Sequence, residues 1–169
     1  MAEVIIDFEG CRRKGIRQIG IIQSNDLRII NTWDVDIVDQ KDIRQILMEA
    51  LEHRPTVLIA HNAHIEKNLL REYLPYQNQK NKSEGLKLSW GPWIDTKEVY
   101  AVLYPKIRDY TLESLTNTFV PKEEVEKKAN EYCLAEKRSP HFALYDSLCT
   151  YMLIKRVWGL VDLAKFARD

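Results

Sequence analysis

The chain has 169 residues, of which 45% are hydrophobic and 30% charged, and Lys+Arg and Asp+Glu both number 25. This length and composition fit one globular domain over 1–169 with a full hydrophobic core. A formal net charge of zero excludes a global attraction to nucleic acid or membrane, so any such contact must be local. No apolar run reaches membrane-spanning length. The widely spaced Cys11, Cys133 and Cys149 suggest reduced thiols and a cytoplasmic location.

The first predicted strand, over 2–10, ends in two acidic residues. Side chains alternate between the two faces of a strand, so Ile5, Asp7 and Glu9 share one face. Both faces are otherwise apolar, which predicts a central strand covered on both sides. Like charges on one face disfavour each other's ionisation, so a metal ion or a basic side chain is expected between them. The alternative is a strand that ends in solvent with two ordinary acids.

The rest of the pattern predicts a mixed sheet flanked by helices. Two apolar runs, separated by a Ser-Asn-Asp turn, continue the first strand as an antiparallel meander, and the next strand is parallel to the first because a helix crosses over before it. In chain order, after the first strand, we predict strands over 16–23 and 27–35, a helix over 42–53, a strand over 56–60, a helix over 61–73, a mobile polar loop over 74–88, a strand near 92–95, and helices over 96–103, 112–118, 123–134 and 141–158.

Two of the predicted helices carry an acidic residue on their apolar side. Glu66 falls in the same arc as Leu69 and Leu70, and Asp146 projects between Leu153 and Val157. An unpaired buried carboxylate costs roughly several kcal/mol, so such acids are expected to converge on cations. Oxygen ligands favour Mg²⁺ or Mn²⁺ over Zn²⁺, and a pair of ions suits in-line displacement at phosphorus. The acids expected to converge are Asp7, Glu9, Glu66 and Asp146.

Three sequence motifs resemble a known family. DFEG at 7–10, HNAHIEKNLL at 61–70 and HFALYD at 141–146, in this order and spacing, resemble the DEDDh 3′-to-5′ exonucleases of the DnaQ-like group. The resemblance covers nearly the whole chain. It implies a ribonuclease-H-like α/β fold, with a five-stranded mixed sheet of three antiparallel and then parallel strands, flanked by helices. Phe142 has no hydroxyl to offer, which favours the histidine branch of the family over the tyrosine branch.

The resemblance also implies residue roles. It places two divalent cations, Mg²⁺ or Mn²⁺, on Asp7, Glu9, Glu66 and Asp146, and makes His141 the general base, which suits an imidazole that titrates near neutrality. The implied reaction is hydrolysis of phosphodiester bonds at single-stranded DNA or RNA 3′ ends, with release of nucleoside 5′-monophosphates. Because the family has aspartate where this chain has Glu66, an attenuated nuclease-fold module that binds nucleic acid or a partner protein without cutting stays open as the alternative.

Further residues are candidates for substrate contact or for positioning. A basic turn beside the acidic pair either guides a phosphate backbone or is simply solvated, and a glycine lets backbone approach a terminal nucleotide or marks a strand exit. The candidates for substrate contact are Gly10, Arg12, Arg13, Asn62 and Arg138, with Lys137 as a further phosphate contact. Asp95 is predicted to cap a helix or support the site by hydrogen bonds, and His61 to shape a helix entry. A homodimer and a subunit of a larger nucleic-acid-processing complex both fit the sequence.

Overall fold

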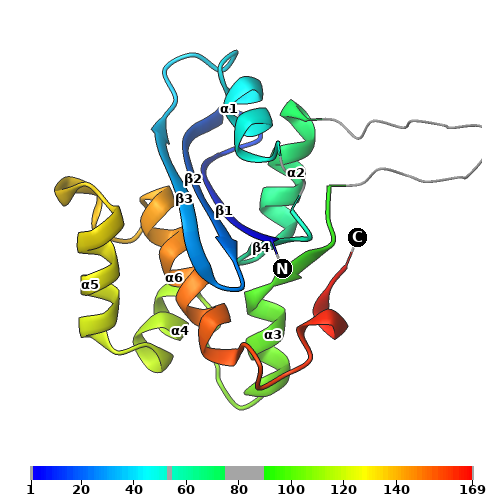
Figure 1. Cartoon of the computed structure of the whole chain (residues 1–169), viewed down its shortest axis with the longest axis vertical. Coiled ribbons are helices and arrows are strands. Elements are labelled where there is room, and N and C mark those ends of the chain that lie inside the picture. Colours follow the sequence, from blue (N-terminus) through cyan, green and yellow to red (C-terminus); the bar gives the residue numbers. More distant parts are fainter. Residues whose placement is uncertain (1, 53–54, 75–89, 169) are drawn as a thin grey trace, which may run out of the picture.

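The computed structural model describes residues 2–52, 55–74 and 90–168. Within these residues, five strands form one mixed sheet in the order β3-β2-β1-β4-β5, so β1 is central as predicted (Figure 1). The strands β1, β2 and β3 form the predicted antiparallel meander, whereas β4 and β5 extend the sheet in parallel. The strands are β1 (Ala2–Cys11), β2 (Gly15–Asn25), β3 (Arg28–Asp36), β4 (Val57–Ala60) and β5 (Trp93–Asp95).

Helices cover both faces of the sheet (Figure 1). On one face, α1 (Ile43–Ala50) and α2 (His64–Tyr73) pack against the side of β1 that carries Val4, Ile6 and Phe8. On the other face, Ile5 packs with residues of the remaining helices, which are α3 (Thr96–Leu103), α4 (Leu112–Phe119), α5 (Lys122–Tyr132) and α6 (Ala143–Val157). The alternating side chains of β1 therefore contribute to two separate hydrophobic cores, one on each face of the sheet. Short 3₁₀ helices, η1 (Ala135–Lys137) and η2 (Leu163–Phe166), precede and follow α6.

Two helices begin later than the sequence pattern predicts. The helix expected from residue 61 begins at His64, because Asn62 has a φ of +63°. The helix expected from residue 141 begins at Ala143, because His141 has a φ of +70°. A positive φ lies outside the right-handed helical region, so both residues belong to turns that precede their helices. The predicted base is thus held by a loop and not by α6.

Other predictions can be compared directly with the structure. The turn between β2 and β3 passes through Asp26 and Leu27, whose φ values of +48° and +56° are typical of a tight hairpin. Within the described residues, no helix is long and apolar enough to cross a membrane. All three cysteines are free thiols. The polar loop predicted over 74–88 falls outside the described residues except for Leu74, which is buried.

Candidate active site

The strand β1 carries two of the predicted acids to its carboxyl end. Asp7 and Glu9 are both half-buried and lie two residues apart, on the face that packs against α6. In the sheet, Asp7 is paired with Gly20 of β2 and Glu9 with Gln18. A register shift follows directly after Glu9, where the regular pairing of β1 with β2 is interrupted. Both carboxylates therefore project from the last regular part of the central strand.

A glycine in β2 allows α6 to approach these acids. Gly20 lies beside Asp7, and a Cβ atom at this glycine would overlap the backbone of Ala143 and Leu144 at the start of α6. The Ser147 hydroxyl donates a hydrogen bond of 2.9 Å to the carbonyl oxygen of Gly20. Close backbone approach of this kind is a typical use of glycine within a strand. The first turns of α6 therefore lie directly against Gly20, the residue that is paired with Asp7.

This contact brings Asp146 and His141 to the acids of β1. The backbone N–H of His141 donates to Oδ2 of Asp146 at 3.1 Å, which ties the exposed loop residue to the helix. One ligand atom from each of Glu9, His141 and Asp146 lies within 4.8 Å of the other two. Groups more than 130 residues apart in the sequence therefore share one small region, with spacing that a metal ion can bridge.

The fourth acid, Glu66, comes from the first turn of α2. Its residue exposure is 4%, and Oε2 has no hydrogen-bond partner among the described residues. Burial raises the pKa of Glu66 to about 8, and the negative charges of Asp95 and Glu9 act in the same direction. A buried carboxylate oxygen without a donor is costly unless a cation or a proton compensates it. Glu66 is thus a buried carboxylate that the described protein groups only partly satisfy.

The other acids show the same mutual repulsion. Burial raises the pKa of Asp7 well above its usual value, and the charges of Asp146, Glu66 and Glu9 raise it further. Burial likewise raises the pKa of Asp146 to about 6, with Glu9 contributing and the backbone N–H of His141 opposing. Since Asp7 is repelled by all three other acids, the four carboxylates form one cluster. The oxygen donors and the accumulated negative charge fit divalent cations.

One basic side chain pairs with the cluster within the described residues. Arg17, which is largely exposed, donates to Oε2 of Glu9 at 3.1 Å. The ion pairs of the described residues do not include Asp7, Glu66 or Asp146. An exposed pair of this type contributes little to stability, and its guanidinium can leave Glu9 at small cost. Among the described residues, basic side chains therefore do not neutralise the cluster as a whole.

Asp95 has the supporting role that the sequence predicts. Its carboxylate caps α3 by accepting from the backbone N–H of Lys97 at 2.9 Å. It also accepts from the backbone N–H groups of Asn62 and Ala63, each at 2.9 Å. One carboxylate thus satisfies donors at the start of α3 and in the turn that precedes α2. Asp95 thereby fixes the turn from which Glu66 is presented.

The His61 side chain contacts α3 and the segment before α4, and its predicted role in shaping the entry of α2 stays a prediction. Its Nδ1 lies 2.8 Å from the Thr96 hydroxyl, and its Nε2 lies 2.9 Å from the carbonyl oxygen of Tyr110. A carbonyl oxygen only accepts, so Nε2 carries the proton. Burial lowers the pKa of His61, although the Tyr110 carbonyl opposes this shift. With both ring nitrogens engaged, His61 joins the end of β4 to two neighbouring segments.

The predicted substrate contacts come from three segments of the chain, and several of them have protein partners in the structure. Arg12 donates to Glu72 of α2 at 2.6 Å, Arg13 is exposed, and Arg138 donates to the carbonyl oxygen of Cys133 at 3.1 Å. Gly10 has a φ of +148°, and a Cβ atom there would overlap the carbonyl oxygen of Gly15 across the hairpin. Since that conformation and that contact both require glycine, Gly10 has a structural role in the β1–β2 hairpin.

Lys137 is placed differently from the prediction that it contacts phosphate. Its residue exposure is 8%, and its ammonium group pairs with Asp34 and Asp36 of β3. The sequence analysis missed these partners, together with Gln18 and Gly20. The sequence does contain an indication of two of these features. Gly20 lies inside the apolar run of β2, and a glycine at such a position indicates close approach of another backbone. Asp34 and Asp36, in the sequence WDVD, repeat the alternating acids of DFEG at the end of another strand.

The arrangement can now be compared with known proteins. No protein-family model and no curated protein matches the sequence. Among solved structures, exonuclease X in complex with 5′-overhanging duplex DNA matches with 21% identity and a TM-score of 0.57, over 98% of this chain and 97% of that one. The chain has the fold of this exonuclease. A 3′-exonuclease described in 3′-end-specific recognition of a histone mRNA stem-loop matches with 15% identity and a TM-score of 0.55, over 92% of this chain and 80% of that one.

These matches confirm the predicted ribonuclease-H-like fold, including its three antiparallel strands followed by parallel ones. In this fold, Glu9, His141 and Asp146 meet at the carboxyl end of the central strand, and the charges of Glu66, Glu9 and Asp146 all raise the pKa of Asp7. The roles of individual residues in metal binding, proton transfer and substrate contact stay predictions.

Proposed function

We propose that the chain is a divalent-metal-dependent 3′-to-5′ exonuclease that hydrolyses phosphodiester bonds at single-stranded DNA or RNA ends and releases nucleoside 5′-monophosphates. The observation that carries this proposal is the convergence of four carboxylates, from β1, α2 and α6, beside an exposed histidine. The likeness of the fold to two exonucleases supports the same reaction class. Fold alone does not determine function, so the acidic cluster provides the main argument.

The cluster supplies the ligand set for the cations. Asp7, Glu9, Glu66 and Asp146 would hold two Mg²⁺ or Mn²⁺ ions, which suit carboxylate oxygen donors. When bound, such ions stabilise negative charge on the phosphoryl group and on the leaving 3′ oxygen. The raised pKa values of Asp7, Glu66 and Asp146 support this assignment, because each reflects a charge that burial and neighbouring acids disfavour.

His141 would remove the proton from the attacking water. Its exposure allows that proton to pass to bulk solvent, and its backbone N–H bond to Asp146 keeps it beside the cluster. Arg12 and Arg13, in the turn that follows Glu9, would attract the phosphate backbone without reading the bases. Arg17 would exchange its contact with Glu9 for a phosphate as the site is loaded.

The test uses 5′-labelled oligonucleotides of DNA and RNA, single- and double-stranded, with Mg²⁺ or Mn²⁺. The expected result is a ladder that shortens from the 3′ end, with at least a roughly 100-fold lower rate for Asp7→Asn because a proposed metal ligand is lost. Asp42→Asn is the matched control, since Asp42 is exposed and its side chain makes no capping hydrogen bond to α1. Binding without shortening would instead support the non-cutting module, and equal rates for Asp7→Asn and the wild type would contradict the proposed site.

A further inference from the structure

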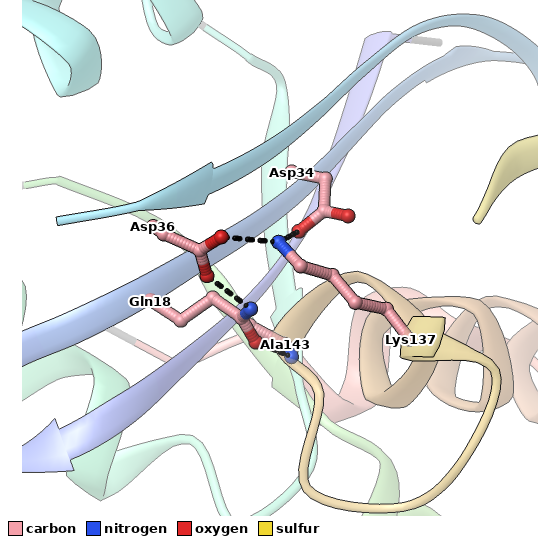
Figure 2. A network of polar contacts seen from close by, with 5 residues as sticks. All are labelled: Gln18, Asp34, Asp36, Lys137 and Ala143. Carbon is pink, nitrogen blue, oxygen red and sulfur yellow. Dashed lines mark hydrogen bonds and ion pairs between the residues drawn. The ribbon is translucent and has the colours of Figure 1, made fainter. Parts of the chain in front are cut away.

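The loop that carries His141 is anchored at its N-terminal end by two ion pairs of a buried lysine. Lys137, at the end of η1, directs its ammonium nitrogen toward two strand residues, at 3.1 Å from Oδ1 of Asp34 and 2.7 Å from Oδ2 of Asp36 (Figure 2). The Lys137 side chain is 10% exposed and that of Asp34 is 13% exposed. Burial disfavours the charge of Lys137, but the two carboxylates outweigh this effect and raise its pKa. Four residues beyond Lys137 in the chain lies His141.

The other end of the loop is anchored to the same place. The backbone N–H of Ala143, the first residue of α6, donates to Oε1 of Gln18 at 2.6 Å. The Gln18 amide nitrogen donates in turn to Oδ1 of Asp36 at 2.7 Å. Figure 2 shows the resulting chain of contacts from Lys137 through Asp36 and Gln18 to Ala143. The two ends of segment 138–142 are therefore joined through side chains of β2 and β3.

The sheet register aligns these anchors with the acidic cluster. Residues paired across neighbouring strands point to the same face, and residues two apart in one strand do so as well. The aligned sets are Asp7, Gly20 and Asp34 in one rung, and Glu9, Gln18 and Asp36 in the other. The candidate metal ligands of β1 are thus paired across the sheet with residues of β2 and β3 that anchor the loop. A displacement of the anchors would move His141 relative to Glu9.

We propose that Lys137, Asp36 and Gln18 form a clamp that positions His141 over the acidic cluster. This inference rests on the proposed function, in which His141 accepts the proton. The argument is geometric: His141 is exposed, has a positive φ, and is held within the described residues by one backbone bond to Asp146. The clamp restricts the loop from both sides and keeps the Lys137 ammonium away from substrate. These three residues are positioning residues, not catalytic ones.

Two variants break the clamp, one at its exposed carboxylate and one at its buried lysine. Asp36→Ala removes a carboxylate whose side chain is 64% exposed, so the fold is expected to survive while Lys137 and Gln18 lose their link. Lys137→Met removes the buried charge and keeps the length of the side chain. Glu131→Ala is the matched control, because it removes an ion pair of the same 2.7 Å length, with Lys128 on α5. Both clamp variants are expected to lower kcat by roughly 10–100-fold with little change in KM, and the control to leave both unchanged.

A double variant separates positioning from general support of the fold. In a His141→Ala background, Asp36→Ala should lower kcat by less than about twofold, because both changes remove the same contribution. A loss as large as in the wild-type background would overturn the inference. If the wild-type chain is active and both Asp36→Ala and Lys137→Met keep the wild-type kcat, the inference is also overturned. That outcome leaves the proposed function intact.

Amide hydrogen exchange, measured by NMR, tests the clamp without an assay of nucleic-acid cleavage. In Asp36→Ala, the amides of His141 and Ala143 should exchange at least roughly tenfold faster, with the middle of α6 unchanged and Glu131→Ala matching the wild type. Unaltered exchange at both amides would overturn the clamp. Absence of cleavage by the wild-type chain would refute the proposed function, and this exchange measurement would still report on the clamp.

Discussion

At the residue scale, Glu66 combines burial with a carboxylate oxygen that is unpartnered in the described part of the chain. Its side chain is buried, and Oε2 lacks a hydrogen-bond donor within the described residues. Glutamate is one methylene longer than the aspartate of the family motif, yet the structure still places its charge in the field of Glu9. The extra length has been accommodated by burial of the side chain at the start of α2. Substitution at this position should therefore separate metal binding from stability.

Glu66→Gln is expected to stabilise the metal-free protein at pH 9 and to weaken the response to metal. The substitution removes a buried charge of the same shape, which should raise the free energy of unfolding by about 1–3 kcal/mol. Thermal unfolding with a chelator, and then with Mg²⁺, measures both effects. Glu98→Gln is the matched control, since Glu98 lies in the first turn of α3 but is exposed. A lower Tm for Glu66→Gln with the chelator would contradict this account.

The same carboxylates set a pH dependence. Glu66 and Asp146 have folded pKa values of about 8 and about 6, above their ordinary values of 4.5 and 3.8. As pH rises from about 4 to 8, the unfolded chain loses these protons before the folded chain does, so the stability of the metal-free protein should fall. The two raised pKa values together correspond to an expected loss of up to about 8 kcal/mol, or up to roughly 16–32 °C in Tm.

Divalent cations should reverse this loss, because they stabilise the ionised acids. Tm measured across pH 5–9, with chelator and with Mg²⁺, should show a metal effect that is large at pH 8 and small at pH 5. A metal-free Tm that increases from pH 5 to 8, with no metal effect at either pH, would be incompatible with four clustered carboxylates.

At the scale of elements, the contact between α6 and β2 determines the site. Gly20 lets the first turn of α6 lie against the strand, and Ser147 donates to its carbonyl oxygen. The helix delivers Asp146, and the loop before it delivers His141, to the end of β1. A side chain at Gly20 has no room to relax, because the atoms that it would meet are backbone atoms.

Gly20→Ala is expected to destabilise the protein by about 2–3 kcal/mol and to reduce cleavage, because α6 must shift away from Asp7. Gly159→Ala is the control: Gly159 has a φ of +76°, but a Cβ atom there meets no atom within 4 Å. Its cost should be limited to about 1 kcal/mol of conformational strain. Urea unfolding and the oligonucleotide assay measure the two effects, and equal losses for the two variants would argue against close packing at Gly20.

The elements themselves were largely predictable from periodicity. Alternation in β1 and the i, i+3, i+4 stripe of α1 gave the correct element types, because burial on one face or both leaves a direct pattern in the sequence. The starts of α2 and α6 were predicted too early. Asn62 and His141 adopt positive φ values that depend on tertiary contacts, such as the Asp146 bond to His141, and hydrophobic periodicity contains no signal for them.

At the scale of the whole molecule, the acidic cluster was predictable and the clamp was not. Glu66 and Asp146 interrupt apolar patterns, and such an anomaly is visible in one sequence. The pairing of Lys137 with Asp34 joins residues 103 positions apart, and each looks like an ordinary surface charge in the sequence. The low exposure of both side chains, 10% for Lys137 and 13% for Asp34, is visible only in the three-dimensional structure.

The proposed function depends on the four carboxylates forming one site for divalent cations. Calorimetric titration of Mn²⁺ into the metal-free wild-type chain at pH 7.5, repeated in two buffers of different ionisation enthalpy, measures both stoichiometry and proton release. The account predicts about two Mn²⁺ per chain, with release of protons from Glu66, and a loss of most binding in Asp7→Asn. Absence of saturable binding, or an identical isotherm for Asp7→Asn, would contradict it.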